Sequence, residues 1–437
     1  MSTLKVNKLR DTAGSADAIT LDPNGGAVLA GVTTISTARV TTGITSTSLQ
    51  VGAAVTITES GIEASGIGIT CASINGTQIG GRRNLIINGA MQVAQRGTSY
   101  TGADSYNTVD RISVQHSGLN EDVTSSQSDV ASGTSPYAEG FRNAFKITNG
   151  NQSAGAGSSD YLYWWTILEA QDVANSGWNY TSASSFITLS FWIKSSVAQN
   201  FYGFLQTGDG TSQSLAYETG SLTADTWTKI VKTIPGNSNL EFGNDNGAGL
   251  YWAPARAFDG TDRTGSVTLD TWGTYSGSAR TPDATSTFYT TDDATLEITG
   301  LQLEVGSQST PFEHRSFGEE LSLCRRYYYR HAEGANGANI GIAAVYQSNN
   351  IFPVIHFPCT MRATPSLDVA DGTGYFRVYS NGDSDAFDTF SSLWNVGDNA
   401  VGVNAYSADG ISGRTGGHAA MVITDHASSH ISFSAEL

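Results

Sequence analysis

The first 99 residues of this chain contain no aromatic side chain, and Tyr100 is the first of 17 Phe, 18 Tyr and 8 Trp residues. Between residues 24 and 81, short β-branched runs are separated by glycines at positions 31, 43, 52, 61 and 66. Each run is typical of a strand and each glycine of a tight turn. Such small apolar side chains hardly offset the ordering entropy of one chain, so we predict a slender β shaft of intertwined chains. The alternative is a flexible low-complexity linker, against which the repeated Ile/Val pattern stands.

The whole chain has 437 residues, enough for two or three domains with their own cores. Only 14% of the residues are charged, while Gly, Ser and Thr are abundant. This composition favours β-structure with many turns over helical bundles. We therefore expect an all-β protein.

The charge balance restricts the partners. The chain has 23 Lys and Arg against 40 Asp and Glu, a net charge of −17. This charge opposes binding to nucleic acid or to an anionic membrane and favours a neutral glycan or a protein. The N-terminus lacks the apolar run of a signal peptide, and no later stretch is long enough to span a bilayer. We expect a soluble chain made in the cytoplasm, without membrane insertion.

The ring-rich part of the chain carries recurrent strand signals. In "SFITLSFWIKSS" the apolar Ile187, Leu189, Phe191 and Ile193 alternate with other residues, which is the period of a half-buried strand. About eight such runs before residue 315 predict a jelly-roll sandwich of two antiparallel sheets. Six further runs, from "NIGIAAVY" to "HISFSAEL", predict a second β-sandwich over residues 332–437.

One helix is predicted, in "HRSFGEELSLCRRYYYR". Ser316 and Glu319 have the spacing of a capping box, and Arg325, Arg326 and Arg330 match the negative end of the helix dipole. The RRYYYR cluster suggests either a glycan or phosphate site or a packed interdomain helix, and we favour the packed helix.

Several of these stretches together resemble bacteriophage tail-fibre and receptor-binding proteins, especially those of marine phages and cyanophages. The similarity rests on "RNLIINGAMQVAQRGTS", "TLSFWIKSS", "DTWTKIVKTIPG", "LEITGLQLEVGSQSTPFEHRSFGEELSLCRRYYYR" and "ISFSAEL", in this order. The resemblance implies a carbohydrate-binding-module-like jelly roll and a homotrimer on the virion tail. The N-terminal "STLKVNKLRD" is similar, more weakly, to the virion-anchoring ends of such fibres.

The resemblance and the residue patterns together give five expected regions. They are a virion-anchoring N-terminus (1–30), a β-repeat shaft (31–83), a jelly roll (84–315), a linking helix (316–331) and a distal β-sandwich tip (332–437). The expected function is a structural tail fibre, without enzymatic activity. Its N-terminus would bind phage tail proteins through Lys5, Lys8 and Arg10, and its C-terminal β domains would recognise host surface glycan or lipopolysaccharide.

Two other functions stay open: a receptor-cleaving tailspike depolymerase, and a bacterial adhesin or carbohydrate-binding module. A depolymerase needs two carboxylates about 5 to 9.5 Å apart, and Asp209 with Glu218 is one pair that the sequence allows. Familiar hydrolase, phosphate-loop and zinc motifs are missing from the sequence. The absent signal peptide argues against a secreted adhesin.

No metal site is predicted, although two patterns were considered. His426 and His430 have i, i+4 spacing but lie where a turn is expected to enter a strand. "NGDSDAFD" is rich in oxygen ligands but lacks the glycine and glutamate of an EF-hand loop, so structural calcium stays a possibility only. No other cofactor is expected.

Tryptophans in polar, glycine-rich or asparagine-rich surroundings are the candidate glycan-stacking residues. A ring that stacks on a sugar contributes about 0.5 to 1.5 kcal/mol beyond its burial. For each ring taken singly, packing in the core remains the alternative. The candidates are Trp164, Trp165, Trp178, Trp252 and Trp272.

Overall fold

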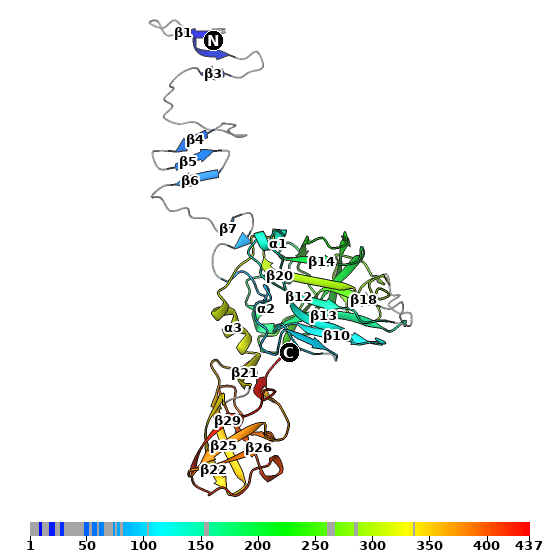
Figure 1. Ribbon diagram of the computed structural model, residues 1–437. Helices are drawn as coiled ribbons and strands as arrows, with labels where there is room; N and C mark the ends of the chain where they lie inside the picture. The colour runs from blue at the N-terminus through cyan, green and yellow to red at the C-terminus, as the bar shows by residue number, and fades with distance from the viewer. Residues whose placement is uncertain are drawn as a thin grey trace. The chain divides into compact units, whose positions relative to one another are not determined.

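A computed structural model describes residues 82–102, 105–152, 157–259, 267–283, 287–334 and 337–437, and the backbone of eight short strands before residue 82 (Figure 1). The chain divides into two units, Met1–Cys71 and Ala72–Leu437. All strand pairs described are antiparallel, and the described helices are few and short. The prediction of an all-β protein is confirmed. Among the described residues, no helix is both long and apolar enough to cross a membrane.

The first unit consists of two small sheets. Strands β1 (Lys8–Arg10), β2 (Asp17–Leu21) and β3 (Ala27–Leu29) form one, and β4 (Ser48–Val51), β5 (Val55–Thr58) and β6 (Gly61–Ala64) form the other. The glycine-punctuated runs thus contain strands, as predicted, and these strands pair within one chain. Lys5 and the side chains of Lys8 and Arg10 lie outside the described residues, and the intertwining of several chains stays a prediction.

The second unit begins with the hairpin β7 (Ser73–Ile74) and β8 (Thr77–Gln78) and then forms a sandwich of two six-stranded sheets. Sheet A has the order β10 (Ser113–Ser117), β13 (Tyr161–Glu169), β18 (Ala248–Asp259), β15 (Asn200–Thr207), β16 (Gln213–Ser221), β19 (Gly273–Thr274). Sheet B has the order β17 (Thr228–Pro235), β14 (Phe186–Ser195), β20 (Thr295–Val305), β12 (Asn143–Thr148), β11 (Thr124–Asp129), β9 (Ser99–Thr101). Large apolar side chains from both sheets fill the core between them.

Strand β14 shows how the sandwich differs from the sequence pattern. Ile187, Leu189, Phe191 and Ile193 point into the core, as their alternation predicts. The opposite face is also covered, because Trp192 packs in a second small cluster with Phe141 and Ala90. The strand is therefore buried on both sides, and the prediction of a half-buried strand is wrong.

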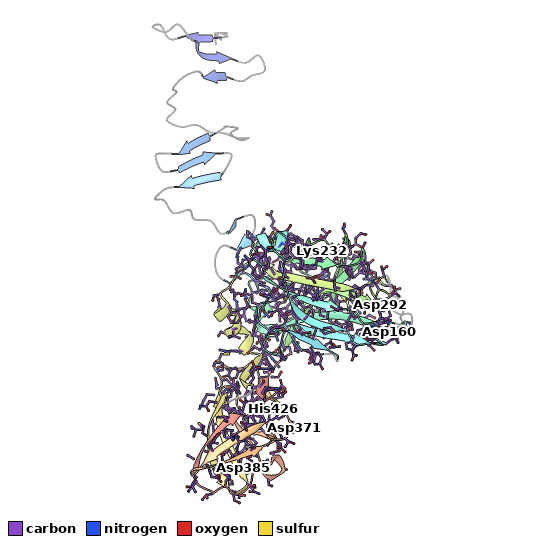
Figure 2. All side chains as sticks on the ribbon, in the orientation of Figure 1. Asp160, Lys232, Asp292, Asp371, Asp385 and His426 are labelled. Atoms are coloured by element: carbon purple, nitrogen blue, oxygen red, sulfur yellow. The ribbon has the colours of Figure 1, made fainter. Side chains whose placement is uncertain are left out.

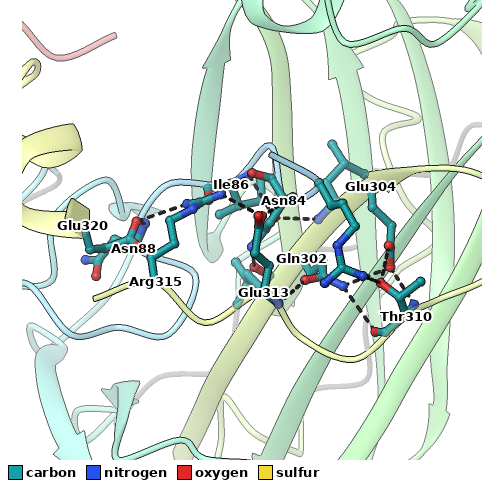
Figure 3. Close-up of polar contacts among 12 residues, drawn as sticks. Asn84, Ile86, Asn88, Gln302, Glu304, Thr310, Glu313, Arg315 and Glu320 are labelled. Atoms are coloured by element: carbon teal, nitrogen blue, oxygen red, sulfur yellow. Dashed lines mark hydrogen bonds and ion pairs between the residues drawn. The ribbon is translucent and has the colours of Figure 1, made fainter. Parts of the chain in front are cut away.

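A polar network fastens the chain that covers the outer side of sheet B, and it includes two of the stretches that carry the resemblance (Figure 3). Asn84 donates to the Leu301 carbonyl at 3.0 Å and accepts from the Leu303 amide at 3.1 Å, so it mimics a neighbouring strand of β20. Arg315 donates to the Ile86 carbonyl at 3.0 Å and lies 3.4 Å from Glu320. The motif residues in this network are therefore structural, because they fasten residues 84–88 to β20 and to the helix that follows.

The predicted helix is real but shorter than expected. Helix α3 spans Phe317–Arg325, and the Ser316 side chain accepts from the Glu319 amide, as the capping box predicts. Residues Tyr328–Glu333 form strand β21 instead of helix, because they pair with the C-terminal strand. The other α-helices described are α1 (Ser135–Ala138) and α2 (Ala170–Ala174).

The second sandwich follows α3. Its seven-stranded sheet C has the order β26 (Asp383–Phe387), β25 (Phe376–Ser380), β29 (Ala419–Thr424), β22 (Asn339–Gln347), β23 (Asn350–His356), β28 (Ala400–Asn404), β27 (Ser392–Trp394). Sheet D consists of β21, β30 (His430–Ser434) and β24 (Ser366–Val369), and a 3₁₀-helix spans Ser407–Asp409. Both sheets contribute to one apolar core. The six strands predicted from the sequence are all present.

A buried ionic cluster joins the two sandwiches. Glu169, at the end of β13, accepts from Arg326 Nε at 2.7 Å, from Arg326 Nη2 at 2.8 Å and from the Tyr327 hydroxyl at 2.6 Å. Burial disfavours the charge of Glu169, but these hydrogen bonds outweigh burial and lower its pKa. The RRYYYR cluster thus supplies interdomain packing, which is the role favoured from the sequence.

Candidate functional site

The outward face of sheet A carries a row of aromatic rings. On β13, Tyr161, Tyr163 and Trp165 alternate with Leu162 and Trp164, which lie in the core. Because successive residues of a strand point to opposite sides, the three alternate rings share the outward face. This is the longest run of alternating aromatic residues on one strand face in the described part of the chain.

The row continues onto the neighbouring strand. Ring centroids are 5.5 Å apart for Tyr161 and Tyr163, 5.4 Å for Tyr163 and Trp165, and 5.0 Å for Trp165 and Tyr251 of β18. Tyr163 is buried, whereas Tyr161, Trp165 and Tyr251 are half-buried and keep part of each ring at the surface. We call these four residues the aromatic row. Burial raises the pKa of Tyr163 and Tyr251, so both phenols stay protonated hydrogen-bond donors.

Two arginines contact Tyr163, in the middle of the aromatic row. The Arg256 guanidinium lies 4.8 Å from the Tyr163 ring centroid and is buried, and it donates to Thr281 at 3.3 Å. Arg280 donates to the Tyr163 hydroxyl at 3.0 Å and also to Tyr275. These contacts hold Tyr163 in one orientation and place positive charge beside the rings, at distances suited to cation–π attraction.

Amide side chains flank the row on both sides. Gln115 of β10 is the cross-strand partner of Tyr163, and Gln206 of β15 is the partner of Tyr251. Both glutamines are half-buried. Partly exposed rings with amides and guanidinium groups nearby can stack on the apolar face of a sugar while hydrogen-bonding its hydroxyls. The aromatic row is therefore a candidate glycan-binding surface.

The structure corrects most of the tryptophan prediction. Trp164 and Trp252 are 0% exposed, and Trp178 and Trp272 are 3% and 8% exposed, all within the sandwich core. A ring in the core cannot stack on a sugar, so these four are packing residues. Trp165 alone of the five lies on the outward face. Tyr161 and Tyr251 were missed as surface rings, although the Y-L-Y-W-W alternation in β13 was the signal for Tyr161. Tyr163 is 3% exposed and packs against the surface rings instead of offering its own face.

The carboxylate pair considered for cleavage does not meet. Glu218 lies opposite Tyr202 in the β15–β16 hairpin, whereas Asp209 follows the other end of β15 and accepts from the Gly243 amide at 2.8 Å. The five residue steps from Tyr202 to Thr207 span about 16 Å along the strand, beyond the roughly 5 to 9.5 Å that glycoside hydrolysis needs.

The two sequence patterns that resemble metal sites take other roles in the structure. His426 lies in a turn and stacks on Tyr375, with ring centroids 4.3 Å apart, and His430 begins β30. In "NGDSDAFD", Asn381 and Gly382 adopt positive φ values of 55° and 79° and turn the β25–β26 hairpin. Figure 2 shows His426 and Asp385 well apart on the second sandwich. Within the described residues, no group of three or more His, Cys, Asp or Glu is placed to hold a metal ion.

A hollow of about 370 Å³ lies where the two sandwiches meet. Within it, Asp368 accepts from the Tyr328 hydroxyl at 2.8 Å and lies 3.3 Å from His430. The hydrogen bond to His430 and that from Tyr328 hold the pKa of Asp368 at about 2 against the effect of burial. Because these polar groups bind one another, the hollow is better explained as packing than as a site.

The fold defines the class of protein as an antiparallel β-sandwich, and its outward face carries a candidate glycan-binding surface. No protein-family model matches the chain, and no curated protein sequence matches it. Solved structures are similar to this chain in part. Among them are the enzymatically active domain of tailspike protein 4 of bacteriophage CBA120 (8% identity, TM-score 0.27), a putative sugar binding protein from Bacteroides thetaiotaomicron (11%, 0.24) and the tandem CBM22 domains of Paenibacillus barcinonensis Xyn10C (9%, 0.22).

The extent of these similarities differs. The matches cover 51%, 51% and 74% of this chain, and 21%, 99% and 93% of the respective structures. The chain thus spans about a fifth of the tailspike structure. At these identities and TM-scores the similarities carry no argument about function, which has to rest on the residues themselves.

Proposed function

We propose that this chain is the subunit of a phage tail fibre that binds host surface polysaccharide through the aromatic row of sheet A. The observation that carries the glycan part is the group of half-buried rings Tyr161, Trp165 and Tyr251 around the buried Tyr163 on the outward face of sheet A, beside amide and guanidinium side chains. The net charge of −17 supports a neutral glycan over an anionic polymer.

The virion part of the proposal rests on the resemblance of the sequence motifs to tail-fibre proteins. In it, the N-terminal region with Lys5, Lys8 and Arg10 attaches to phage tail proteins, and three copies form the fibre. The fibre acts by binding and does not cleave its receptor, whether a capsule glycan or lipopolysaccharide. Release of new reducing ends from host polysaccharide by the purified chain would contradict the non-enzymatic assignment.

The test is equilibrium binding of the full chain to polysaccharide extracted from the host envelope. Replacing Trp165→Ala removes one stacking ring, so the affinity should fall about 2- to 12-fold, which corresponds to 0.5 to 1.5 kcal/mol. The matched control is Tyr100→Ala, since Tyr100 is 41% exposed on β9 of sheet B. Tyr161→Ala should weaken binding in the same range.

Melting curves of each variant separate loss of binding from loss of fold. If Trp165→Ala and Tyr161→Ala both bind like Tyr100→Ala while all three remain folded, the aromatic row is not the glycan site.

A further inference from the structure

Sheet C exposes an unusually apolar outward face. Six large apolar side chains on it are between 39% and 67% exposed: Tyr379 of β25, Met421 of β29, Ile342 and Tyr346 of β22, Val354 of β23 and Trp394 of β27. The strand register makes them neighbours. Met421 lies opposite both Tyr379 and Ile342, and Gly402 lies opposite both Val354 and Trp394. We call these six residues the tip face.

The area of the tip face is at the upper end of what a monomer usually leaves exposed. A large side chain buries about 150 to 250 Å², so six that are roughly half exposed offer on the order of 600 Å². The largest apolar patch on a typical monomer is about 300 to 600 Å², and a standard protein interface buries about 800 Å² per partner. The tip face is therefore large enough to form most of an interface.

The tip face has few acidic residues for a strongly acidic chain, and Asp383, which lines the hollow at one end of it, is paired with Arg414 at 2.9 Å. Its outward positions on β25, β29, β22, β23, β28 and β27 include no Asp or Glu, and the one arginine among them, Arg377, is paired with Asp425 at 2.8 Å. Two copies of a chain with a net charge of −17 repel each other over most of their surface. Because Asp383 and Asp425 are each paired with an arginine, a second copy can approach this face with little repulsion between carboxylates.

The shape of the tip face is also compatible with contact to a second copy of the chain. Near one end the rings of Tyr346, Phe352 and Trp394 form a ridge, with centroids 5.6 and 4.6 Å apart. At the other end a hollow of about 660 Å³ is lined in part by Ile342, Tyr379 and Met421. One face thus offers an aromatic ridge and a hollow, so the ridge of one copy can enter the hollow of the next in a head-to-tail contact, the kind that a ring of three copies can close.

We infer that the tip face is a contact between copies of this chain, held by burial of apolar side chains on sheet C. Sugars are poor occupants of such a face, because their hydroxyls would be buried with few hydrogen-bond partners. The inference does not depend on the glycan proposal. It concerns a different sheet, and it assigns to the second sandwich a share of the self-association that the sequence suggested for the shaft.

The test uses chemical cross-linking of the full chain. Ala344 is exposed on β22 between Ile342 and Tyr346, so Ala344→Cys places a thiol within the tip face. Cys71 and Cys359 are replaced by serine, and Cys324 is retained because it is fully buried. Ala427→Cys, at an exposed turn before β30, is the matched control. A short bis-maleimide should convert the Ala344→Cys chain into covalent multiples of 46.0 kDa at least tenfold more efficiently than the control.

Charge insertion provides the second measurement. Ile342 is 67% and Val354 56% exposed, so Ile342→Asp with Val354→Asp should leave the fold of one copy intact, as circular dichroism will report. These changes should reduce cross-linking through Ala344→Cys at least tenfold. Equal cross-linking of Ala344→Cys and control chains, or linkage unaffected by the two aspartates, overturns the inference. A third outcome also overturns the inference. If Ala344→Cys gives no linkage and the variant with the two aspartates no longer adsorbs to host cells, the tip face binds the receptor instead of a second copy.

Discussion

Glu169 is expected to be the most sensitive polar position between the two sandwiches. Its side chain is 1% exposed. The carboxylate accepts hydrogen bonds from Nε and Nη2 of Arg326, from the Tyr327 hydroxyl and from the Gln171 side-chain amide. Glu169→Gln keeps the size of the side chain but replaces one acceptor oxygen with an NH₂ group. The new NH₂ group cannot accept hydrogen bonds and would face the donors that the lost oxygen served. At least two charge-assisted hydrogen bonds are therefore lost.

The magnitude follows from the burial of the two partners. Breaking a buried ion pair costs about 3 to 5 kcal/mol, and each hydrogen bond to a charged group contributes about 1.5 to 3 kcal/mol. Arg326 is 31% exposed, so water replaces part of what it loses. We expect Glu169→Gln to lower the free energy of unfolding by about 2 to 4 kcal/mol at neutral pH. Because the Glu169 pKa is lowered in the folded state, this stabilisation is present above pH 4.5 and is lost as the pH falls through the folded pKa.

The assay is urea unfolding of the full chain followed by tryptophan fluorescence. A double-mutant cycle with Arg326→Met isolates the pair, and its coupling energy should be at least 2 kcal/mol. Asp270→Asn is the control, since Asp270 is 57% exposed and lies 3.8 Å from Lys232, and it should change stability by less than about 1 kcal/mol. A coupling energy below about 0.5 kcal/mol would refute the reasoning.

Three other outcomes are expected. Burial raises the pKa of Asp110 to about 6, so folding stability should fall by roughly 2 to 3 kcal/mol as the pH rises from 4 to 7, and Asp110→Asn should remove most of this fall in urea titrations. Gly300 has φ 68°, and a Cβ there would lie 2.7 Å from the Phe141 ring, so Gly300→Ala should destabilise by about 2 to 4 kcal/mol. Gly220→Ala, at φ 73° with open space around it, should cost only about 1 kcal/mol in the same assay. Finally, a calcium chelator should leave the melting temperature of the full chain unchanged, and a fall on chelation would indicate structural calcium.

The sequence predicted elements better than it predicted which side chains they expose. Strand periodicity alone identifies Leu162 and Trp164 as partners on one face of β13, and Tyr163 and Trp165 as partners on the other. Two adjacent tryptophans therefore could not both face a ligand, a constraint that the sequence contained. By contrast, Trp272 lies outside any regular strand, and its burial depends on its hydrogen bond to the Pro235 carbonyl at 2.9 Å. No local pattern specifies that contact.

The end of α3 shows the same limit in another form. Charge placement and side-chain spacing support a helix through Arg330, yet the chain leaves the helix at Arg325. Tyr328 pairs with Ser434, more than 100 residues later, and its hydroxyl bonds Asp368. Pairing with the C-terminal strand thus overrides local helix propensity. A partner so distant in sequence is invisible to any short window.

The two outward faces differ in a way that separates their roles. Around the aromatic row, rings are interleaved with Gln115, Gln206 and Arg280, so a sugar that stacks there also finds partners for its hydroxyls. The tip face offers apolar area with few such partners, which suits a protein surface of the same kind. If sheet C holds copies together while sheet A binds glycan, each assembly presents several weak sites at high effective concentration, and avidity can exceed single-site affinity by about 10²- to 10⁴-fold. Single contacts of modest strength would then suffice for attachment. Loss of the tip face would lower adsorption to cells while leaving the affinity for a short oligosaccharide unchanged, whereas Trp165→Ala would lower both.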